Sequence, residues 1–409
     1  MKNKNILFGL FLNTLLFFLS YIVPKRPGTV LLGGGLGNRF SGNPKYFYLH
    51  LCCESERSSK PFGSFAWITK NRRIYEQMLI QKRPALFAWS FKGFWAILRT
   101  EQLVIESGNA PGIGGHDIAY ERLFPGRFNI FQTWHGTPLK HICLDVFRDR
   151  QLNRWYEKFY FWLYRRELSS LSSVLALSDI AKQRFLTGFD NQNIAILGYP
   201  KNDIFYGDPG KWKVNYRWHS FSKVLLYAPT FRDHPGAVKP FSGMFFETLN
   251  DELKSRNWCL LIKKHQFDHT MDFPGELSNI FDISEDTDDV QEVLVQSDVL
   301  ISDYSSIFID YLLRKKPVIF YIYDLESYLD KSRQMYCEFL EEVPGPFARN
   351  EKELLDLLLN AGEWFKEHRY QDEFNNALGF YHKFQDGDSC IRFQNLLLSC
   401  SKLANKQSS

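Results

Sequence analysis

The chain has 409 residues, of which 44% are hydrophobic and 23% are charged. This composition excludes a disordered or collagen-like chain, and the length is sufficient for about two domains with buried cores. The 50 Lys and Arg residues exceed the 46 Asp and Glu residues by too little to indicate wholesale nucleic-acid binding. Any function of positive charge must therefore come from local clusters.

The seven cysteines are scattered along the chain, and no CxxC pair is present that could hold zinc or exchange electrons. We interpret them as reduced core thiols. Because disulfides rarely persist in the cytoplasm, this usage indicates a cytoplasmic protein.

Residues 6–23 form an apolar run of about the length that spans a bilayer. Two lysines precede the run, and Pro24, Lys25 and Arg26 follow it without a small-residue cleavage site, so a cleaved signal peptide is not expected. Three interpretations remain open: a spanning anchor, a helix lying in the membrane interface, or a helix packed against protein. We treat residues 1–26 as a hydrophobic, membrane-associating segment.

Short β-branched and apolar runs alternate with helix-length segments through the first half of the chain, which predicts a parallel sheet covered on both faces. One of the intervening helices is expected over 71–82. The expected strands are the run after Pro27 (TVLL), 65–69, 85–89, 103–107, 128–132, 173–177 and 194–198.

A second series of strands begins near residue 223, after a polar stretch with proline and glycine at 208–218 that suits a linker. We therefore predict two doubly wound domains, 27–207 and 208–385, with a ligand cleft at the carboxyl ends of the strands, and a helix and tail at 386–409 that could cross back to the first domain. The strands of the second series are expected at 223–230, 258–265, 279–284, 298–303 and 317–324, with helices at 243–255 and 307–315.

The glycine loop GGGLGN at 33–38 lacks the third glycine of a dinucleotide fingerprint, because Asn38 occupies that place. NAD binding is therefore not expected. The glycines either allow the backbone to pass close to another group in the cleft or simply make the turn.

The motif SDYSS at 302–306 joins an expected strand to an expected helix. Ser305 and Ser306 thus stand where unpaired backbone N–H groups and the helix dipole favour an anion. The hydroxyls could instead cap the helix. Asp303 is not required for capping, which favours a phosphate site.

Two further strand ends of the second domain also present polar groups. APTFRDH at 228–234 offers Thr230, Arg232 and Asp233, and the guanidinium fork suits two phosphate oxygens unless it pairs with the neighbouring aspartate. The next strand ends in Lys263, Lys264 and His265. Three consecutive strand ends therefore carry the cations, hydroxyls and imidazole that a diphosphate site requires.

The first domain contributes TWHGTPLKH at 133–141, directly after an expected strand. An imidazole with an ordinary pKa near 6.5 makes His135 a candidate general base. A lone histidine is more often structural. Here Gly136 and Pro138 favour a turn and Lys140 lies close in sequence, which favours a catalytic role.

HGTPLK, GYPKND, YAPTFRD, SDYSSIFIDY and the PGP at 344–346, in this order, resemble the CDP-glycerol glycerophosphotransferase family, whose members build teichoic acids and related capsule polymers. The similarity extends from NPKY at 43–46 and WITKN at 67–71 to FQDGDS at 384–389. This chain departs from the family pattern at Gln266, where proline is usual, and at Lys201, where arginine is common.

The resemblance implies an α/β, GT-B-like fold of two Rossmann-type domains, the first binding the acceptor and the second the CDP-activated donor. The implied reaction is transfer of glycerol phosphate to a hydroxyl of a lipid-linked or polymeric acceptor at the cytoplasmic face of the membrane, with release of CMP. It implies two catalytic histidines, His135 as the base and His265. We expect substrate contacts from Gly136, Thr137, Lys140, Thr230, Arg232, Asp233, Asp303, Ser305 and Ser306.

The sequence contains no carboxylate cluster that would predict an obligatory metal, so no metal is expected. A loosely held Mg²⁺ is the alternative. No other cofactor and no nucleic-acid partner is expected. The basic and aromatic run at 154–166 is interpreted either as a membrane-interface helix or as a core-packed helix with basic edges.

Three other functions remain as alternatives: a GT-B glycosyltransferase that uses a nucleotide sugar, a transferase of ribitol phosphate from CDP-ribitol, and a catalytically inactive membrane-bound scaffold. CDP-glycerol and CDP-ribitol differ in the length of the polyol, and one or two carbinol units change only the length of the donor pocket. The sequence therefore does not distinguish these two donors. The sequence leaves open whether one unit or many are added, and to which acceptor.

Overall fold

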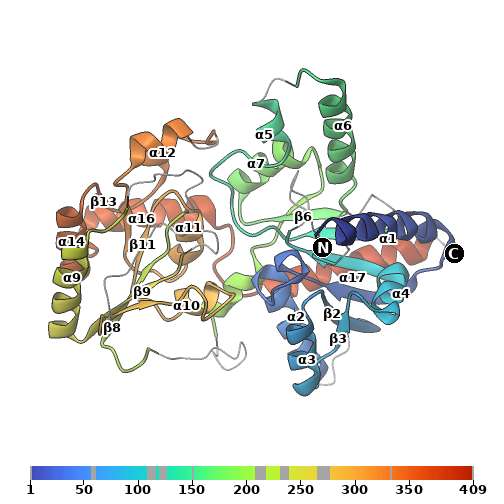
Figure 1. The fold of residues 1–409 in the computed structure, drawn as a ribbon, viewed down its shortest axis with the longest axis horizontal. Helices are drawn as coiled ribbons and strands as arrows, with labels where there is room; N and C mark the ends of the chain where they lie inside the picture. Colours follow the sequence, from blue (N-terminus) through green and yellow to red (C-terminus); the bar gives the residue numbers. More distant parts are fainter. Residues whose placement is uncertain are drawn as a thin grey trace. The chain divides into compact units, whose positions relative to one another are not determined.

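The computed structural model describes residues 2–56, 61–107, 117–118, 127–149, 152–207, 218–230, 239–264, 277–331 and 334–407 (Figure 1). The chain divides into two compact units. Unit 1 contains Met1–His135, Ile142–Lys213 and His382–Ser409, and unit 2 contains Gly136–His141 and Val214–Tyr381. The carboxy-terminal segment thus belongs to the first unit, and the peptide bond between His135 and Gly136 is one of the places where the chain passes from one unit to the other.

Unit 1 is built on a parallel seven-stranded sheet of order β3-β2-β1-β4-β5-β6-β7. Val30, Leu103 and Val174 are fully buried in three of its strands, as apolar runs covered on both faces require. The strands are β1 (Arg26–Leu32), β2 (Ser64–Thr69), β3 (Ala85–Phe87), β4 (Thr100–Ile105), β5 (Asn129–Gln132), β6 (Ser173–Ala176) and β7 (Ile194–Ile196).

Three helices of unit 1 begin where a polar side chain accepts unpaired amides of the first turn. Asn71, Ser90 and Ser178 cap α3, α4 and α7 in this way. The last helix, α17, packs against β1 and α2. The described helical segments are α1 (Lys2–Ile22), η1 (Gly35–Gly37), α2 (Gly42–Glu56), α3 (Arg72–Ile80), α4 (Phe91–Arg99), α5 (Leu144–Arg148), α6 (Trp155–Ser169), α7 (Asp179–Phe189), η2 (Pro200–Phe205) and α17 (Ser389–Gln407).

Unit 2 is built on a parallel six-stranded sheet of order β10-β9-β8-β11-β12-β13. The strands are β8 (Lys223–Tyr227), β9 (Trp258–Ile262), β10 (Ile280–Asp282), β11 (Val299–Ser302), β12 (Val318–Tyr321) and β13 (Phe347–Ala348). Its described helices are α9 (Gly243–Arg256), α10 (Gln291–Leu294), α11 (Ile307–Leu312), α12 (Leu325–Lys331), α13 (Phe339–Glu342), α14 (Glu351–Leu359), α15 (Ala361–Trp364) and α16 (His368–Tyr381).

The prediction of parallel sheets with intervening helices is confirmed in both units. Each predicted strand is present within a few residues of its expected bounds. The strand β13 was not predicted, because a strand of two residues leaves no periodic signal in the sequence. In each sheet the strand order reverses next to the first strand of the unit, and in such sheets this switch point is where ligands bind.

The amino-terminal segment is the helix α1, and it contacts α4. Leu16 and Ser20 are buried, whereas Phe11 and Phe18 are each 61% exposed. Among the described residues, no helix is both long enough and apolar enough to cross a membrane. The part of α1 whose side chains are described is therefore partly packed and partly exposed.

Candidate functional site

Two neighbouring strand ends of unit 2 are joined by the buried side chain of Asp303. Its two carboxylate oxygens accept the backbone N–H of Thr230 at 2.9 and 3.0 Å, and Oδ1 also accepts the Thr230 hydroxyl at 2.6 Å. The two residues follow β11 and β8, which pair in parallel. This places two of the predicted donor contacts together at the switch point of the sheet.

The two serines after β11 lie half-buried at the start of α11. The Ser305 hydroxyl accepts the backbone N–H of Ile307 at 3.3 Å. Ser306 stands at the N-cap, and its side chain makes no capping hydrogen bond. The Ser305 hydroxyl thus accepts one amide at the helix start, whereas the Ser306 hydroxyl does not cap the helix.

The segment 136–141 of the HGTPLKH motif belongs to unit 2, where it meets the SDYSS turn. A Cβ atom placed on Gly136 would lie 3.1 Å from Ser306 Oγ. The close approach of this hydroxyl to the backbone therefore depends on glycine. Thr137 is 1% exposed, and its buried Oγ1 has no hydrogen-bond partner among the described residues. A buried hydroxyl of this kind is costly unless another group completes it.

Lys140 has a protein partner in the same unit. Its ammonium group donates a hydrogen bond to the hydroxyl of Tyr328 and lies 4.9 Å from the centre of that ring. The ring of Tyr328 stacks on Tyr304 of the SDYSS motif, with 3.9 Å between the ring centres. The structure therefore shows Lys140 linking the two motifs, while its expected contact with substrate stays a prediction.

A short antiparallel bridge holds the same segment in place. Lys140 pairs with Met335, the His141 N–H donates to the Gln334 carbonyl at 2.7 Å, and the Tyr336 N–H donates to the Leu139 carbonyl at 2.8 Å. The end of the HGTPLKH motif is thus fixed by backbone hydrogen bonds that its sequence does not reveal.

His135 is the last residue of unit 1 before this segment, and it follows β5. Its side chain is exposed, with the imidazole stacked on the indole of Trp134 at 4.5 Å between ring centres. The structural alternative considered from the sequence, a histidine satisfied within a core, does not describe this exposed ring. An exposed imidazole is able to exchange protons with a bound hydroxyl.

Three predicted site residues, Arg232, Asp233 and His265, lie outside the described residues. The neighbouring lysines are described and have partners. The ammonium group of Lys264 pairs with Asp282 at 2.7 Å, and that of Lys263 donates to the Ser284 carbonyl at 2.8 Å. The two described lysines at the end of β9 therefore bind residues in and directly after β10.

Two of the motifs that carried the resemblance meet inside unit 1, far from the donor residues in sequence. The carboxylate of Asp203 in GYPKND accepts the N–H groups of Ser389 and Cys390, at 3.0 and 2.8 Å. Burial raises the pKa of this carboxyl to about 6, against the lowering effect of those hydrogen bonds. Asp203 therefore caps α17 and ties it to η2.

The glycine loop at 33–38 surrounds a second buried carboxylate. Asp117 accepts the N–H groups of Leu36, Glu106 and Ser107 at 2.5 to 2.7 Å, and burial raises its pKa to about 7. A Cβ atom on Gly33 would lie 2.8 Å from the Asp117 carbonyl oxygen. The glycines thus allow the backbone to pass close to Asp117 inside unit 1, whereas the expected approach to a group in the cleft stays a prediction.

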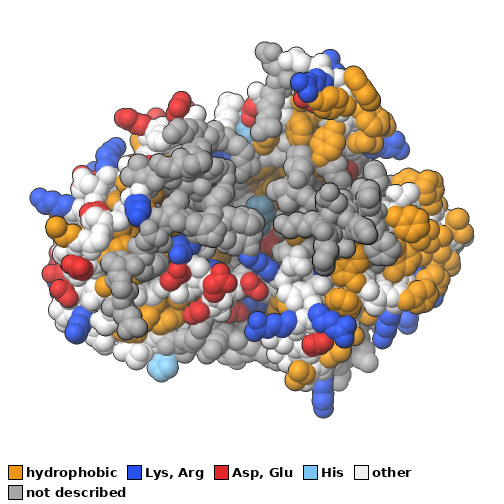
Figure 2. Space-filling view, in the orientation of Figure 1, with side chains coloured by type: hydrophobic (Ala, Val, Ile, Leu, Met, Phe, Trp, Pro, Cys, Tyr) orange, Lys and Arg blue, Asp and Glu red, His pale blue; other side chains and the backbone are white. Residues whose placement is uncertain are grey.

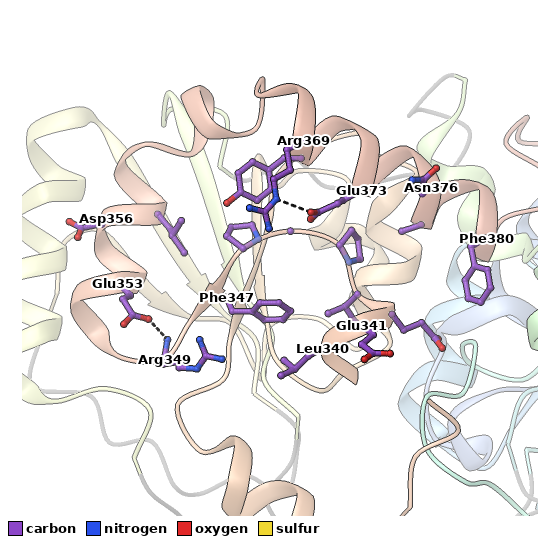
Figure 3. Close-up of a pocket in the computed structure, with 18 residues that line it drawn as sticks. Leu340, Glu341, Phe347, Arg349, Glu353, Asp356, Arg369, Glu373, Asn376 and Phe380 are labelled. Atoms are coloured by element: carbon purple, nitrogen blue, oxygen red, sulfur yellow. Dashed lines mark hydrogen bonds and ion pairs between the residues drawn. The ribbon is translucent and has the colours of Figure 1, made fainter. Parts of the chain in front are cut away.

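A cavity of about 950 Å³ runs along β13, the edge strand of unit 2 (Figure 3). It lies between the PGP turn at 344–346, α14 and α16, and carries the ion pair of Arg369 with Glu373. None of the predicted site residues lines it, and β12 separates its edge strand from β11. We therefore do not assign it to the donor site.

The described residues include no group of three or more His, Cys, Asp or Glu side chains arranged to hold a metal ion. All seven cysteines are free thiols, as expected. Only Cys143, Cys259 and Cys390 are buried, so the prediction that all of them lie in cores was wrong.

Known proteins resemble this chain along most of its length. It is 28% identical over 380 residues to the teichoic acid glycerol-phosphate transferase of Staphylococcus aureus (strain NCTC 8325 / PS 47), covering 87% of this chain and 89% of that protein. It is 27% identical over 353 residues to the teichoic acid poly(glycerol phosphate) polymerase of Bacillus subtilis (strain 168). That match covers 84% of this chain but only 45% of the polymerase.

A solved structure of the wall teichoic acid polymerase TagF superimposes with a TM-score of 0.77 at 23% identity, covering 98% of this chain and 96% of that one. This similarity supports a GT-B-like fold. The profile of the family described as CDP-Glycerol:Poly(glycerophosphate) glycerophosphotransferase matches residues 15–399. The chain therefore belongs to this family of enzymes, as its motifs predicted.

Proposed function

We propose that the protein transfers glycerol phosphate from CDP-glycerol to a hydroxyl group of a teichoic acid or capsule polymer precursor. The observation that supports this most directly is the meeting of two family motifs in unit 2, where Gly136 lies against Ser306 beside the Asp303–Thr230 pair. Related proteins carry the same activity in their names, and a His-to-Asn variant of TagF has been solved after soaking with CDPG.

In the proposed reaction, the acceptor hydroxyl attacks the β-phosphorus, which bears the glycerol. A new P–O bond forms, the bond to the bridging oxygen breaks, and CMP leaves with that oxygen and its electron pair. His135 accepts the proton of the attacking hydroxyl. Such transfers depend mainly on positioning and on neutralising charge at the phosphoryl oxygens.

The donor is held by the strand ends of unit 2. The Ser306 hydroxyl and the buried Thr137 hydroxyl are suited to donate hydrogen bonds to the diphosphate, while Asp303 fixes the backbone of Thr230. Arg232 and His265 follow the same strands in sequence and complete the proposed charge on this side. Because Gly136 is bonded to His135, the proposed base is one residue away from the segment that touches Ser306.

His135→Ala tests the assignment of the base. We expect CMP release to fall to background, while the dissociation constant for CDP-glycerol stays within about threefold of wild type, because the imidazole acts on the acceptor. Release of CMP is followed by chromatography and donor binding by calorimetry. Activity at the wild-type level would contradict the role of His135.

The same assay separates the two candidate donors. We expect CMP from CDP-glycerol in preference to CDP-ribitol. A preference for CDP-ribitol would reassign the donor and leave the site unchanged.

We further propose that unit 1 binds the cytoplasmic face of a membrane, where a lipid-linked acceptor is presented. Figure 2 shows exposed hydrophobic side chains gathered over α1 and α4, and again over α6. On α6 the aromatic residues are accompanied by arginine and lysine, a combination that favours lipid headgroups. The exposed side chains are Phe11, Phe18, Tyr21 and Ile22 on α1, Phe91 and Trp95 on α4, and Trp155, Tyr156, Phe159 and Trp162 on α6.

Sedimentation with liposomes tests this second proposal. Replacing Trp155, Phe159 and Trp162 by serine should release most of the protein from vesicles that contain anionic lipid, because each ring contributes buried apolar area at the interface. The control is Leu329→Ser on α12 of unit 2, whose wild-type side chain is 48% exposed. This variant should leave binding intact. Equal binding of both variants would show that α6 does not contact the membrane.

A further inference from the structure

The turn that carries His135 is held by two side chains whose motifs had no assigned function. The amide group of Asn43, from NPKY, donates to the carbonyls of Thr133 at 3.2 Å and Trp134 at 2.7 Å. The ammonium group of Lys201, from GYPKND, donates to the carbonyl of His135 itself at 2.7 Å. Three successive carbonyls that have left the sheet are thus completed by two residues of unit 1.

The two donors are also joined to each other. Asn43 Oδ1 accepts the backbone N–H of Lys201 at 3.1 Å, so a single amide side chain connects the turn to η2. Both residues are buried, with exposed fractions of 0% and 6%. A hydrogen-bond network of this kind loses its geometry when one member is removed, because the remaining buried groups are left without partners.

Asn43 is itself fixed at the first turn of α2. Its backbone N–H donates to Glu106 Oε1 at 2.9 Å. The preceding Gly42 has a φ of +69°, and a Cβ atom there would lie 2.1 Å from the same carboxylate. The backbone of Asn43 is therefore fixed independently of the hydrogen bonds that its side-chain amide makes to the turn.

The backbone of the turn needs this support because Trp134 has a φ of 52°, in the left-handed region. Its N–H donates to Gln132 Oε1 at 2.9 Å, and its ring packs edge-on against Phe185 and Phe189. The imidazole of His135 stacks on the indole of Trp134. The ring on which the imidazole stacks thus belongs to a residue in a strained backbone conformation.

We propose that Asn43 and Lys201 are positioning residues that hold the His135 imidazole in its reactive orientation through the backbone of residues 133–135. This inference rests on the proposed role of His135 as the base. It also explains how lysine serves at a position where the family commonly has arginine, since a single carbonyl acceptor needs one donor and not a planar fork.

Four variants test the proposal: Asn43→Ala, Asn43→Asp, Lys201→Met and Lys201→Arg. Asn43→Asp keeps the acceptor for Lys201 N–H but presents oxygen to the two carbonyls. We expect the alanine, aspartate and methionine variants to lose about 10- to 100-fold in kcat, with KM for CDP-glycerol within about threefold, because a misplaced base weakens the chemical step and not donor binding. Lys201→Arg should retain more activity than Lys201→Met.

Asn191→Ala is a matched control in the same unit. Asn191 is 3% exposed, and its amide group donates to the carbonyls of Leu168, Ser169 and Leu171, as that of Asn43 donates to two carbonyls of the turn. Its Oδ1 accepts the N–H of Asn193, just as Asn43 accepts that of Lys201. This variant should lose stability comparably and keep kcat near wild type. An equal loss of kcat in both asparagine variants would overturn the proposal.

A second measurement does not depend on activity. In histidine-labelled protein, the Hε1 resonance of His135 is identified by its absence from His135→Ala, and the indole of Trp134 shifts it upfield. Asn43→Ala and Lys201→Met should move this resonance toward the value of a free histidine, and Asn191→Ala should not. If Asn43→Ala fails to fold, the two Lys201 variants decide the matter.

The outcomes for the two proposals are separate. Full activity of His135→Ala would remove the proposed base, whatever the positioning variants show. An inactive His135→Ala, together with wild-type kcat and an unmoved His135 resonance in Asn43→Ala and Lys201→Met, would retain the base and overturn the positioning role.

Discussion

The carboxylate of Asp303 binds Thr230, which lies 73 positions away in sequence. The backbone N–H of Thr230 is shared between the two carboxylate oxygens, and its hydroxyl donates to Oδ1. An asparagine at position 303 has only one acceptor oxygen and would present an NH₂ group to the amide of Thr230. The bond pattern explains why an aspartate stands at the end of β11.

We therefore expect Asp303→Asn to weaken CDP-glycerol binding by roughly 10- to 100-fold, because the end of β8 loses its fixed position, and to lower the free energy of unfolding by about 1 to 3 kcal/mol. Calorimetry and urea unfolding measure the two effects. Thr230→Val keeps the backbone bonds and should show a smaller loss of affinity, whereas Thr230→Ser should bind like wild type. A donor affinity unchanged in Asp303→Asn would contradict the assignment.

Gly136→Ala should interfere with Ser306. The added methyl group would lie 3.1 Å from the Ser306 hydroxyl oxygen, so we expect KM for CDP-glycerol to rise about 3- to 10-fold. In a Ser306→Ala background the same change should have little effect, because the hydroxyl is already absent. This non-additivity in a double-mutant cycle is the measurement.

Gly243→Ala serves as the control for the glycine variant, since a Cβ atom there meets no atom within 4 Å. It should leave KM unchanged. Strictly additive effects of Gly136→Ala and Ser306→Ala would show that the two residues do not interact in the enzyme.

Tyr328 should matter for the position of the HGTPLKH segment through both its ring and its hydroxyl. Tyr328→Phe keeps the stack on Tyr304 and the ring under Lys140, so we expect a loss of about 1 kcal/mol in the free energy of unfolding. Tyr328→Leu removes the ring as well and should lose more. Urea unfolding of the two variants gives the order, and equal losses would show that the ring contributes nothing.

The buried carboxyl groups predict how stability depends on pH. The pKa of Asp203 is raised to about 6 in the folded protein, so folding favours its protonated form. Its contribution is fully present below the pKa of the unfolded chain, near 4, and is lost as the pH rises through about 6. Burial raises the pKa of Asp117 to about 7, which extends the same trend.

Asp203→Asn removes the Asp203 contribution and leaves the part due to Asp117. The free energy of unfolding of wild type minus that of the variant should therefore fall by on the order of 2 to 3 kcal/mol between about pH 4 and pH 6. Urea unfolding at pH 4.5, 6 and 8 measures it. A wild-type stability that rises from pH 4.5 to pH 8, with no change of slope in Asp203→Asn, would contradict this account of the Asp203 carboxyl.

The amino-acid sequence by itself determined the succession of strands, the two parallel sheets and the strand ends that carry polar groups. Strands buried on both faces appear as continuous apolar runs, and the residues that follow them gather at one edge of a parallel sheet. This is why Thr230 and Asp303 could be predicted to lie together. The motifs also identified the family.

Only the tertiary structure decided which partner each polar side chain has. Asn43 reaches Trp134 across 91 residues and Lys201 across 158, and Asp203 reaches Ser389 across 186. Such contacts depend on how whole elements pack, whereas the local patterns of a sequence report only on neighbours three or four residues apart in a helix or two apart in a strand. For the same reason the sequence could name His135 but not the residues that hold it.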